Sequence, residues 1–228
     1  MKECRGHSFV FVISFVMNII QSKYIISSPK VEECPSSKLP EYAFIGRSNV
    51  GKSSLINMIC NNSKLAKTSA APGKTQYINH FLIDALTGTK NRQQKQQWFL
   101  VDLPGYGYAK TAQSNRKSWQ KMISHYLTER KTLLNTFILL DSRHSPQKID
   151  LEFVDQMGTW GLPFTLVFTK ADKEKPGAVS RNVKAFTDEL LKTWQFLPQQ
   201  FITSAINKSG RHEILDFIET CNANAQGA

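Results

Sequence analysis

The chain contains the stretch Gly46-Arg47-Ser48-Asn49-Val50-Gly51-Lys52-Ser53, a complete match to the pattern G-x-x-x-x-G-K-[ST]. An apolar run at residues 42–45 precedes it, and the residues at 54–59 are apolar at helical spacing. A glycine-rich loop between a strand and a helix directs backbone N–H groups at phosphate oxygens. The stretch therefore predicts a nucleoside-phosphate site, in which Lys52 bridges the β- and γ-phosphates and the Ser53 hydroxyl binds Mg²⁺.

Length and composition indicate one ordinary domain: 228 residues, of which 41% are hydrophobic and 21% charged. The formal net charge of +11 is more than a phosphate loop needs. It favours an extended polyanion as partner, RNA rather than a membrane, because no basic amphipathic helix stands out. A generally basic surface is the alternative. The four cysteines are scattered without a C-x-x-C pair, which argues against a disulfide framework or a zinc site and favours a reducing compartment.

The amino terminus carries an apolar stretch at residues 9–20, interrupted only by Ser14 and Asn18. It is shorter than the roughly 20 residues of a membrane span, and no cleavage site of a signal peptide follows. We interpret residues 1–22 as an extension, with Met17 as the true initiator. An edge strand at 23–27 and a connecting loop at 28–40 are expected next.

Two further motifs predict contacts on the γ-phosphate side. Thr75, in the polar loop 64–76, is placed to carry a hydroxyl that reaches the metal only when the γ-phosphate is present. The sequence D-L-P-G at residues 102–105 ends the apolar run 98–101. In this D-x-x-G motif Asp102 holds a metal-bound water, and the Gly105 amide senses the γ-phosphate.

The sequence T-K-A-D at residues 169–172 follows the apolar run 164–168 and fits the base-selecting pattern [NT]-K-x-D. The Asp172 carboxylate can accept hydrogen bonds from guanine N1–H and N2–H₂, donors that adenine lacks in that geometry. The stem of Lys170 would pack along the purine plane. Ser204-Ala205, after the run 201–203, can present backbone amides to guanine O6, although this dipeptide alone is nearly uninformative.

Three basic segments leave a functional and a structural interpretation open. Residues 84–97 form a polar, basic insertion, which is a hairpin tip that either contacts RNA or is merely solvated. The aromatic segment 106–110 and Arg116, Lys117 and Lys121 could form a surface that the nucleotide rearranges, with Tyr106 and Tyr108 on RNA bases, on a partner protein or packed within the loop. Arg143 and His144 either touch a partner or support their loop.

Taken in order, these motifs are those of a GTPase, and the residues within and around them resemble one particular family of GTPases. G-R-S-N-V-G-K-S-S-L-I-N, A-x-P-G-K-T-Q, V-D-L-P-G-Y-G-Y-A-K and L-D-x-R-H-x-P resemble the EngB (YihA/YsxC) family of bacterial GTP-binding proteins over residues 23–222. The resemblance implies a TRAFAC-class GTPase domain, Mg²⁺ dependence and a cytoplasmic role in maturing the large ribosomal subunit. It also implies a need for the protein in normal cell division and septation.

Carried over by position, the resemblance assigns each site residue a role. The phosphate contacts are Gly46, Arg47, Ser48, Asn49, Val50, Gly51, Lys52 and Ser53, with Gly73, Lys74, Thr75, Gln76, Tyr77, Asp102, Leu103, Pro104 and Gly105 on the γ-phosphate side. The base contacts are Thr169, Lys170, Ala171, Asp172, Thr203, Ser204 and Ala205. The Mg²⁺ ligands are Ser53, Thr75 and, through water, Asp102. Lys52, Thr75 and Gly105 are expected to be catalytic, together with Asn49 if K⁺ binds.

Two residues bear on the rate of hydrolysis. Tyr106 stands where Ras-like enzymes carry the glutamine that orients the attacking water, so the intrinsic rate is expected to be at most about 10⁻³ s⁻¹. Asn49 lies where some related GTPases use Asn to hold a K⁺ ion, which supplies the charge of an arginine finger. An Asn chosen only for its backbone geometry is an equally good explanation.

We expect a three-layer α/β domain over residues 23–222 with a tail at 223–228. Its sheet should be mostly parallel, with six or seven strands, one of them antiparallel, and with helices on both faces. The favoured function is a slow GTP/GDP switch on the RNA or protein of the large ribosomal subunit, as a monomer without DNA or stable membrane contacts. The alternatives are a division-site regulator that binds septum proteins, a GTP-binding scaffold with negligible hydrolysis, and, more remotely, an ATP-using enzyme.

Overall fold

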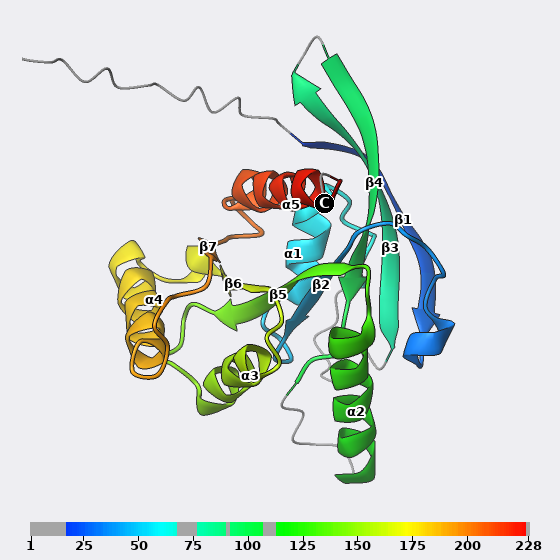
Figure 1. Cartoon of the computed structure of the whole chain (residues 1–228). Helices are drawn as coiled ribbons and strands as arrows, with labels where there is room; N and C mark the ends of the chain where they lie inside the picture. The colour runs from blue at the N-terminus through cyan, green and yellow to red at the C-terminus, as the bar shows by residue number, and fades with distance from the viewer. Residues whose placement is uncertain (1–16, 68–76, 90–91, 107–112, 227–228) are drawn as a thin grey trace, which may run out of the picture.

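The structure is a computed structural model that describes residues 17–67, 77–89, 92–106 and 113–226 (Figure 1). Its centre is a seven-stranded sheet in the order β1-β3-β4-β2-β5-β6-β7. The strands are β1 (Asn18–Ser28), β2 (Glu41–Gly46), β3 (Ile78–Thr89), β4 (Arg92–Asp102), β5 (Leu133–Asp141), β6 (Phe164–Thr169) and β7 (Gln200–Ile202). Only β3 among them is reversed: it pairs antiparallel with β1 and β4, and the other pairs are parallel. The expected sheet is confirmed.

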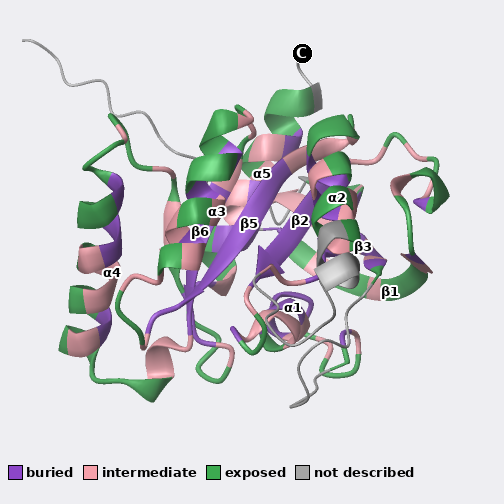
Figure 2. Ribbon diagram, turned by 90° about the horizontal axis from the view of Figure 1, so that it is seen from below, coloured by how far each residue is buried: buried purple, intermediate pink, exposed green. Residues whose placement is uncertain are grey.

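Helices cover both faces of this sheet. They are α1 (Lys52–Ile59), α2 (Gln113–Glu129), α3 (Lys148–Thr159), α4 (Pro176–Leu190) and α5 (Arg211–Gln226), with short 3₁₀ turns η1 (Val31–Glu33) and η2 (Ala171–Lys173). One core cluster joins α1 and α5 to the sheet, and a second joins α2, α3 and α4. Figure 2 shows the buried central strands between these helices. The three-layer prediction is confirmed.

The apolar runs of the sequence become central strands because both of their faces are covered. In β2, Tyr42 and Phe44 belong to the cluster with α1 and α5, whereas Ala43 and Ile45 belong to the opposite cluster. Successive side chains of a strand point to opposite faces, so a strand between two helical layers is apolar at every position. All six residues of β2 are buried. The phosphate loop therefore begins at the end of a fully buried strand.

The edge of the sheet differs from the expected boundaries. The predicted strand 23–27 is present, but β1 begins at Asn18, because β3 is long enough to pair with that residue through Leu86. Met17 is buried in the cluster of α1 and α5. The segment 1–16, and with it most of the proposed extension, lies outside the described residues, so the start at Met17 stays a hypothesis. At the other end, α5 continues to Gln226, beyond the expected boundary at 222.

The predicted hairpin at 84–97 is confirmed as part of a longer one. Strands β3 and β4 pair continuously from Asn79 opposite Asp102 to Thr89 opposite Arg92. Most of the polar insertion is therefore regular strand, and it extends past α5 at one end of the molecule (Figure 1). No helix in the described ranges is both long and apolar enough to cross a membrane.

A buried charged cluster joins β2 to the end of α2. Glu41 has no exposed surface, and its carboxylate accepts hydrogen bonds from the Tyr126 hydroxyl at 2.5 Å and from the Arg130 Nη2 atom at 2.5 Å. The Arg130 Nη2 atom also donates to the Pro35 carbonyl oxygen at 2.6 Å. The Nε2 atom of His80, on β3, lies 3.6 Å from the carboxylate. This cluster fixes the carboxyl-terminal end of α2, the helix that follows the D-x-x-G motif.

Candidate nucleotide-binding site

The predicted motifs meet at one edge of the sheet. The phosphate loop follows β2, the D-x-x-G motif begins at the end of β4, T-K-x-D begins at the end of β6, and Ser204-Ala205 follows β7. These strands are parallel, so their carboxyl ends lie together, which is where open α/β sheets bind ligands. The fold thus brings together motifs that are spread over residues 46–205 of the sequence.

The phosphate loop has the backbone geometry of an anion site. Asn49 has φ 62° and Gly51 has φ 104°, both in the left-handed region. Helix α1 begins at Lys52, directly after Gly51, and no side chain caps its first N–H groups. Uncapped N–H groups at a helix N-terminus attract an anion. The loop can therefore bind phosphate oxygens, as the sequence predicts.

Gly105 packs directly on the phosphate loop. A Cβ atom placed on Gly105 would lie 2.6 Å from the Gly46 carbonyl oxygen and 3.4 Å from the Ser48 nitrogen. The Leu103 N–H donates to the Phe44 carbonyl oxygen at 3.0 Å and extends β4 along β2. Only glycine permits this approach of two backbones. The D-x-x-G motif is thus in contact with the loop whose ligand it is expected to sense.

Lys52 and Asp102 bring opposite charges to the same point. The Lys52 ammonium contacts the buried Asp102 carboxylate, and the Nδ2 atom of Asn79 lies 3.4 Å from the second carboxylate oxygen. A carboxylate and the hydroxyl of Ser53 are the hard oxygen donors that Mg²⁺ prefers, and substrate phosphates complete such a site. The residues present therefore fit a Mg²⁺–nucleotide complex. Four residues that the sequence places near this complex lie outside the described residues: Gly73, Lys74, Gln76 and the expected metal ligand Thr75. Tyr77 is exposed just before β3.

The base-selecting motif is tied to the phosphate loop. The Thr169 hydroxyl donates to the Val50 carbonyl oxygen at 2.6 Å. Lys170, in the left-handed region with φ 61°, places its Nζ atom against the Asn49 carbonyl oxygen. The same Nζ atom lies 2.9 Å from Oδ2 of Asp141. The lysine side chain thus joins the two loops, and its packing along a base stays a prediction.

Asp172 is fixed by the side chain of Ser204. The Ser204 hydroxyl donates to Oδ1 of Asp172 at 2.6 Å, and this bond lowers the pKa of the carboxyl group. Backbone hydrogen bonds hold the two loops in register: the Ala171 N–H donates to the Thr203 carbonyl oxygen at 3.1 Å. Asp172 is therefore a charged acceptor with a set orientation. The sequence singled out Ser204 and Ala205 only for their backbone amides, and the role of the Ser204 hydroxyl was not predicted.

Asp141, at the end of β5, organises the neighbouring loop. It accepts hydrogen bonds from Arg143 Nε at 2.9 Å, from Arg143 Nη2 at 2.7 Å and from Lys170. Burial alone would raise the pKa of Asp141, but these cations hold it well below its usual range. His144 is exposed, with its Nε2 atom 3.9 Å from Asp141. These contacts give Arg143 a structural role in its loop, one of the two interpretations left open by the sequence.

Asp150, on α3, accepts hydrogen bonds from the phosphate loop and from the residue that follows the D-x-x-G motif. Arg47 Nε donates to its two oxygens at 2.9 and 3.0 Å, and the Tyr106 hydroxyl donates to Oδ1 at 3.0 Å. The Tyr106 ring stacks on Phe153, with centroids 4.2 Å apart and an interplanar angle of 14°. Asp150 is only 3% exposed, and its burial raises its pKa despite these donors. No motif marks an aspartate inside a helix, so sequence reasoning missed this residue.

Comparison with known proteins agrees with this geometry. A family model described as "50S ribosome-binding GTPase" matches residues 41–170. The chain is 51% identical over 206 residues to the "Probable GTP-binding protein EngB" of Christiangramia forsetii, which covers 90% of this chain and 98% of that protein. It is also 51% identical over 203 residues to the protein of the same name from Bacteroides thetaiotaomicron, covering 89% of this chain and 95% of that protein.

Solved structures show the same fold at low sequence identity. A crystal structure of Era in complex with MgGDPNP and nucleotides of 16S ribosomal RNA superposes with a TM-score of 0.60 at 22% identity, covering 79% of this chain and 55% of that chain. A crystal structure of a probable GTP-binding protein EngB gives a TM-score of 0.54 at 20% identity, covering 80% and 99%. The family model spans more than half of the sequence, and relatives share half of their residues over nine-tenths of it. The chain belongs to the EngB family of GTP-binding proteins.

Proposed function

We propose that this protein is a slow, Mg²⁺-dependent GTPase that acts as a switch in assembly of the large ribosomal subunit, as a cytoplasmic monomer. Through that role it is needed for normal cell division and septation. The observation that carries the switch is the contact of Gly105 with Gly46, because a shift of either loop must move the other. The ribosomal partner is supported by the description of the matching family model and by the net charge of +11.

The residues of the site divide the chemistry between them. Lys52 would neutralise phosphate charge, and Ser53, Thr75 and Asp102 (through water) would hold Mg²⁺, which would supply further positive charge to the phosphates. Asp172 selects guanine, because adenine has no hydrogen-bond donors to pair with the oriented carboxylate of Asp172. The Gly105 amide is the proposed sensor of the γ-phosphate.

Tyr106 supports a low intrinsic rate. Its hydroxyl already donates to Asp150, and burial raises the pKa of this phenol well above 10. A phenol that stays protonated at neutral pH cannot act as a general base. We therefore propose hydrolysis no faster than about 10⁻³ s⁻¹ until a partner reorganises the site. Asn49, whose backbone is left-handed, is proposed as a K⁺ ligand; equal hydrolysis rates in K⁺ and Na⁺ would remove that role.

Co-sedimentation with purified large ribosomal subunits tests the switch. The protein is loaded with GDP or with a non-hydrolysable GTP analogue, and binding is measured across a salt series. We expect binding in the GTP-like state only, weakening steeply as salt rises. Binding that ignores the nucleotide would contradict the switch, and no binding in either state would favour a division-site regulator. Single-turnover assays with Lys52→Ala as a blank separate slow hydrolysis from none.

A further inference from the structure

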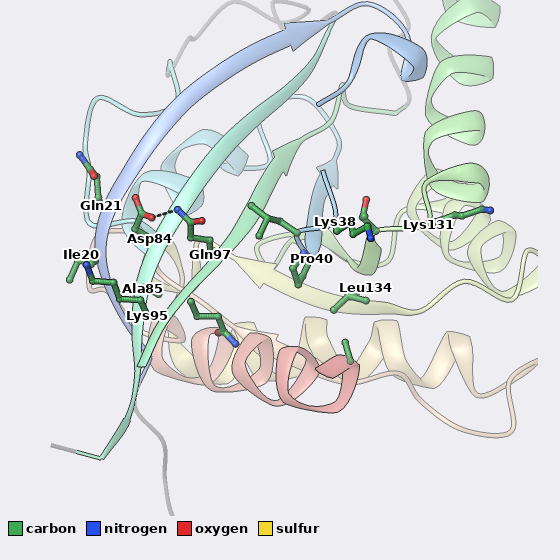
Figure 3. Close-up of a pocket in the computed structure, with 14 residues that line it drawn as sticks. Ile20, Gln21, Lys38, Pro40, Asp84, Ala85, Lys95, Gln97, Lys131 and Leu134 are labelled. Carbon is green, nitrogen blue, oxygen red and sulfur yellow. Dashed lines mark hydrogen bonds between the residues drawn. The ribbon is translucent and has the colours of Figure 1, made fainter. Parts of the chain in front are cut away.

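A groove of about 900 Å³ lies at the end of the sheet opposite the nucleotide site (Figure 3). Its walls come from β1, the β3–β4 hairpin, the segment 38–40 before β2, the connection from α2 to β5, and the end of α5. The nucleotide loops follow the carboxyl ends of the strands, whereas this groove borders the amino ends of β2 and β5. The two sites therefore share strands but no loop.

The charge of the groove is predominantly positive. Lys38, Lys95 and Lys131 line it, and all three side chains are exposed. None of them forms an ion pair with any residue that the structure describes. Figure 3 shows Lys38 and Lys131 at one end of the groove and Lys95 at the other. The single acid in the lining, Asp84, accepts a hydrogen bond from Gln97 at 2.7 Å.

Neutral hydrogen-bonding groups and apolar side chains make up the rest of the lining, and Pro40 and Leu134 lie between Lys95 and the other two lysines (Figure 3). Gln21, Gln96 and Thr132 contribute amide and hydroxyl groups to the lining. The Oε1 atom of Gln96 accepts a hydrogen bond from Asn222 Nδ2 at 3.0 Å, and within the described residues its amide N–H groups have no partner. Spaced lysines on a surface that also carries amide donors match a chain of phosphates.

We propose that this groove binds the sugar–phosphate backbone of structured RNA, an inference that rests on the proposed ribosomal function. None of the fourteen described lining residues is aromatic, so the groove offers no surface on which to stack an unpaired base. Lysine contacts to phosphate carry no sequence information. The groove therefore recognises a folded RNA by its backbone and tolerates changes of base sequence.

The position of the groove separates docking from switching. Its residues lie at the opposite end of the strands from Gly105 and Asp172, so a nucleotide-driven shift of those loops leaves the groove in place. RNA bound there contributes equally in the GDP and GTP states, and this contribution alone is too weak to hold the subunit in the GDP state. State-dependent affinity then comes from the nucleotide end, and the groove adds a constant electrostatic attraction.

A matched pair of triple variants tests this proposal. The groove variant carries Lys38→Gln, Lys95→Gln and Lys131→Gln. The control carries Lys148→Gln, Lys184→Gln and Lys192→Gln, which remove the same charge from exposed lysines on α3, on α4 and just beyond α4. Binding is measured to purified large subunits by sedimentation and to a fluorescein-labelled RNA hairpin by anisotropy, at several salt concentrations. GDP affinity reports whether each variant is folded.

We expect the groove variant to bind both targets about tenfold or more weakly, with a salt slope reduced by about 2, while the control behaves as wild type. Equal binding by wild type and groove variant overturns the proposal. Loss of subunit binding without loss of hairpin binding also overturns it, because the groove would then contact a ribosomal protein. If the wild type does not bind subunits, the ribosomal function fails; the hairpin assay still decides whether the groove binds RNA.

Discussion

Arg47 and Asp150 form an ion pair in which one nitrogen, Nε, lies 2.9 and 3.0 Å from the two carboxylate oxygens. The pair joins the phosphate loop to α3, an element that carries none of the expected nucleotide motifs. Because Tyr106 also donates to Asp150, the residue after the D-x-x-G motif rests on the same anchor. Helix α3 thus supports both loops that face the phosphates.

Replacement of Asp150 by Asn should weaken this support. Asp150→Asn removes the charge that faces Arg47, and the loss of a charged hydrogen bond costs about 2 kcal/mol of unfolding free energy. GDP affinity should fall as well, since the loop loses an anchor. Urea unfolding and GDP titration measure both effects. The control is Glu152→Gln, an exposed residue on the same helix; equal behaviour of the two variants would show that Asp150 has no special role.

Replacement of Gly105 by Ala should separate hydrolysis from binding. The new Cβ atom would lie 2.6 Å from the Gly46 carbonyl oxygen, so the two backbones must move apart. A displacement of this kind should slow single-turnover GTP hydrolysis about tenfold or more. GDP affinity should change by less than about threefold, since GDP does not need the γ-phosphate sensor. Gly177→Ala, in α4 with open space around it, is the control; unchanged hydrolysis in Gly105→Ala would contradict the predicted contact.

Removal of the Ser204 hydroxyl should loosen guanine recognition. In Ser204→Ala the Asp172 carboxylate loses its 2.6 Å donor and with it a fixed orientation. The dissociation constant for GDP should rise about tenfold, and competition by ADP should stay negligible, because Asp172 itself is retained. Fluorescent-nucleotide displacement measures both constants. Ser145→Ala, at an exposed position in another loop, serves as the reference; a wild-type constant in Ser204→Ala would disprove the orienting role.

The Glu41 cluster should make stability depend on acid pH. Burial alone would raise the pKa of Glu41, but His80, Arg130 and Tyr126 outweigh it and lower the pKa from 4.5 to about 2. A carboxyl group with a lowered pKa stabilises the folded state above its unfolded pKa. That contribution, about 3 kcal/mol, should be lost as pH falls from about 4.5 to about 2.

Glu41→Gln tests this assignment. Thermal unfolding between pH 3 and pH 7 should show a steeper fall with acid for wild type than for Glu41→Gln. The variant should be less stable than wild type at pH 7, because Arg130 then lacks its buried partner. Parallel pH profiles for the two proteins would assign the acid sensitivity to other carboxylates.

Local patterns predicted which strands are buried and which motifs follow their carboxyl ends. The loop 46–53, the D-x-x-G motif and T-K-x-D each combine a buried strand with residues whose chemistry is specific, and both parts can be read locally. The anchors could not be predicted, because Asp150 and Glu41 act through partners about 50 to 100 residues away in sequence. The start of β1 was missed for a similar reason, since pairing with Leu86 extends it to Asn18.

Tyr42, near the start of β2, places its hydroxyl 2.7 Å from Oδ1 of Asn222 in α5, 180 residues later. Helix α5 also packs on α1 and covers Phe137 through Phe217. During synthesis, the first half of the domain emerges with this face of its sheet covered only by α1. Nucleotide binding therefore has to wait for the carboxyl-terminal helix, so a nascent chain stalled before Arg211 should not retain GDP, whereas a released chain should. Affinity for GDP then reports that α5 has been synthesised and has packed on the sheet.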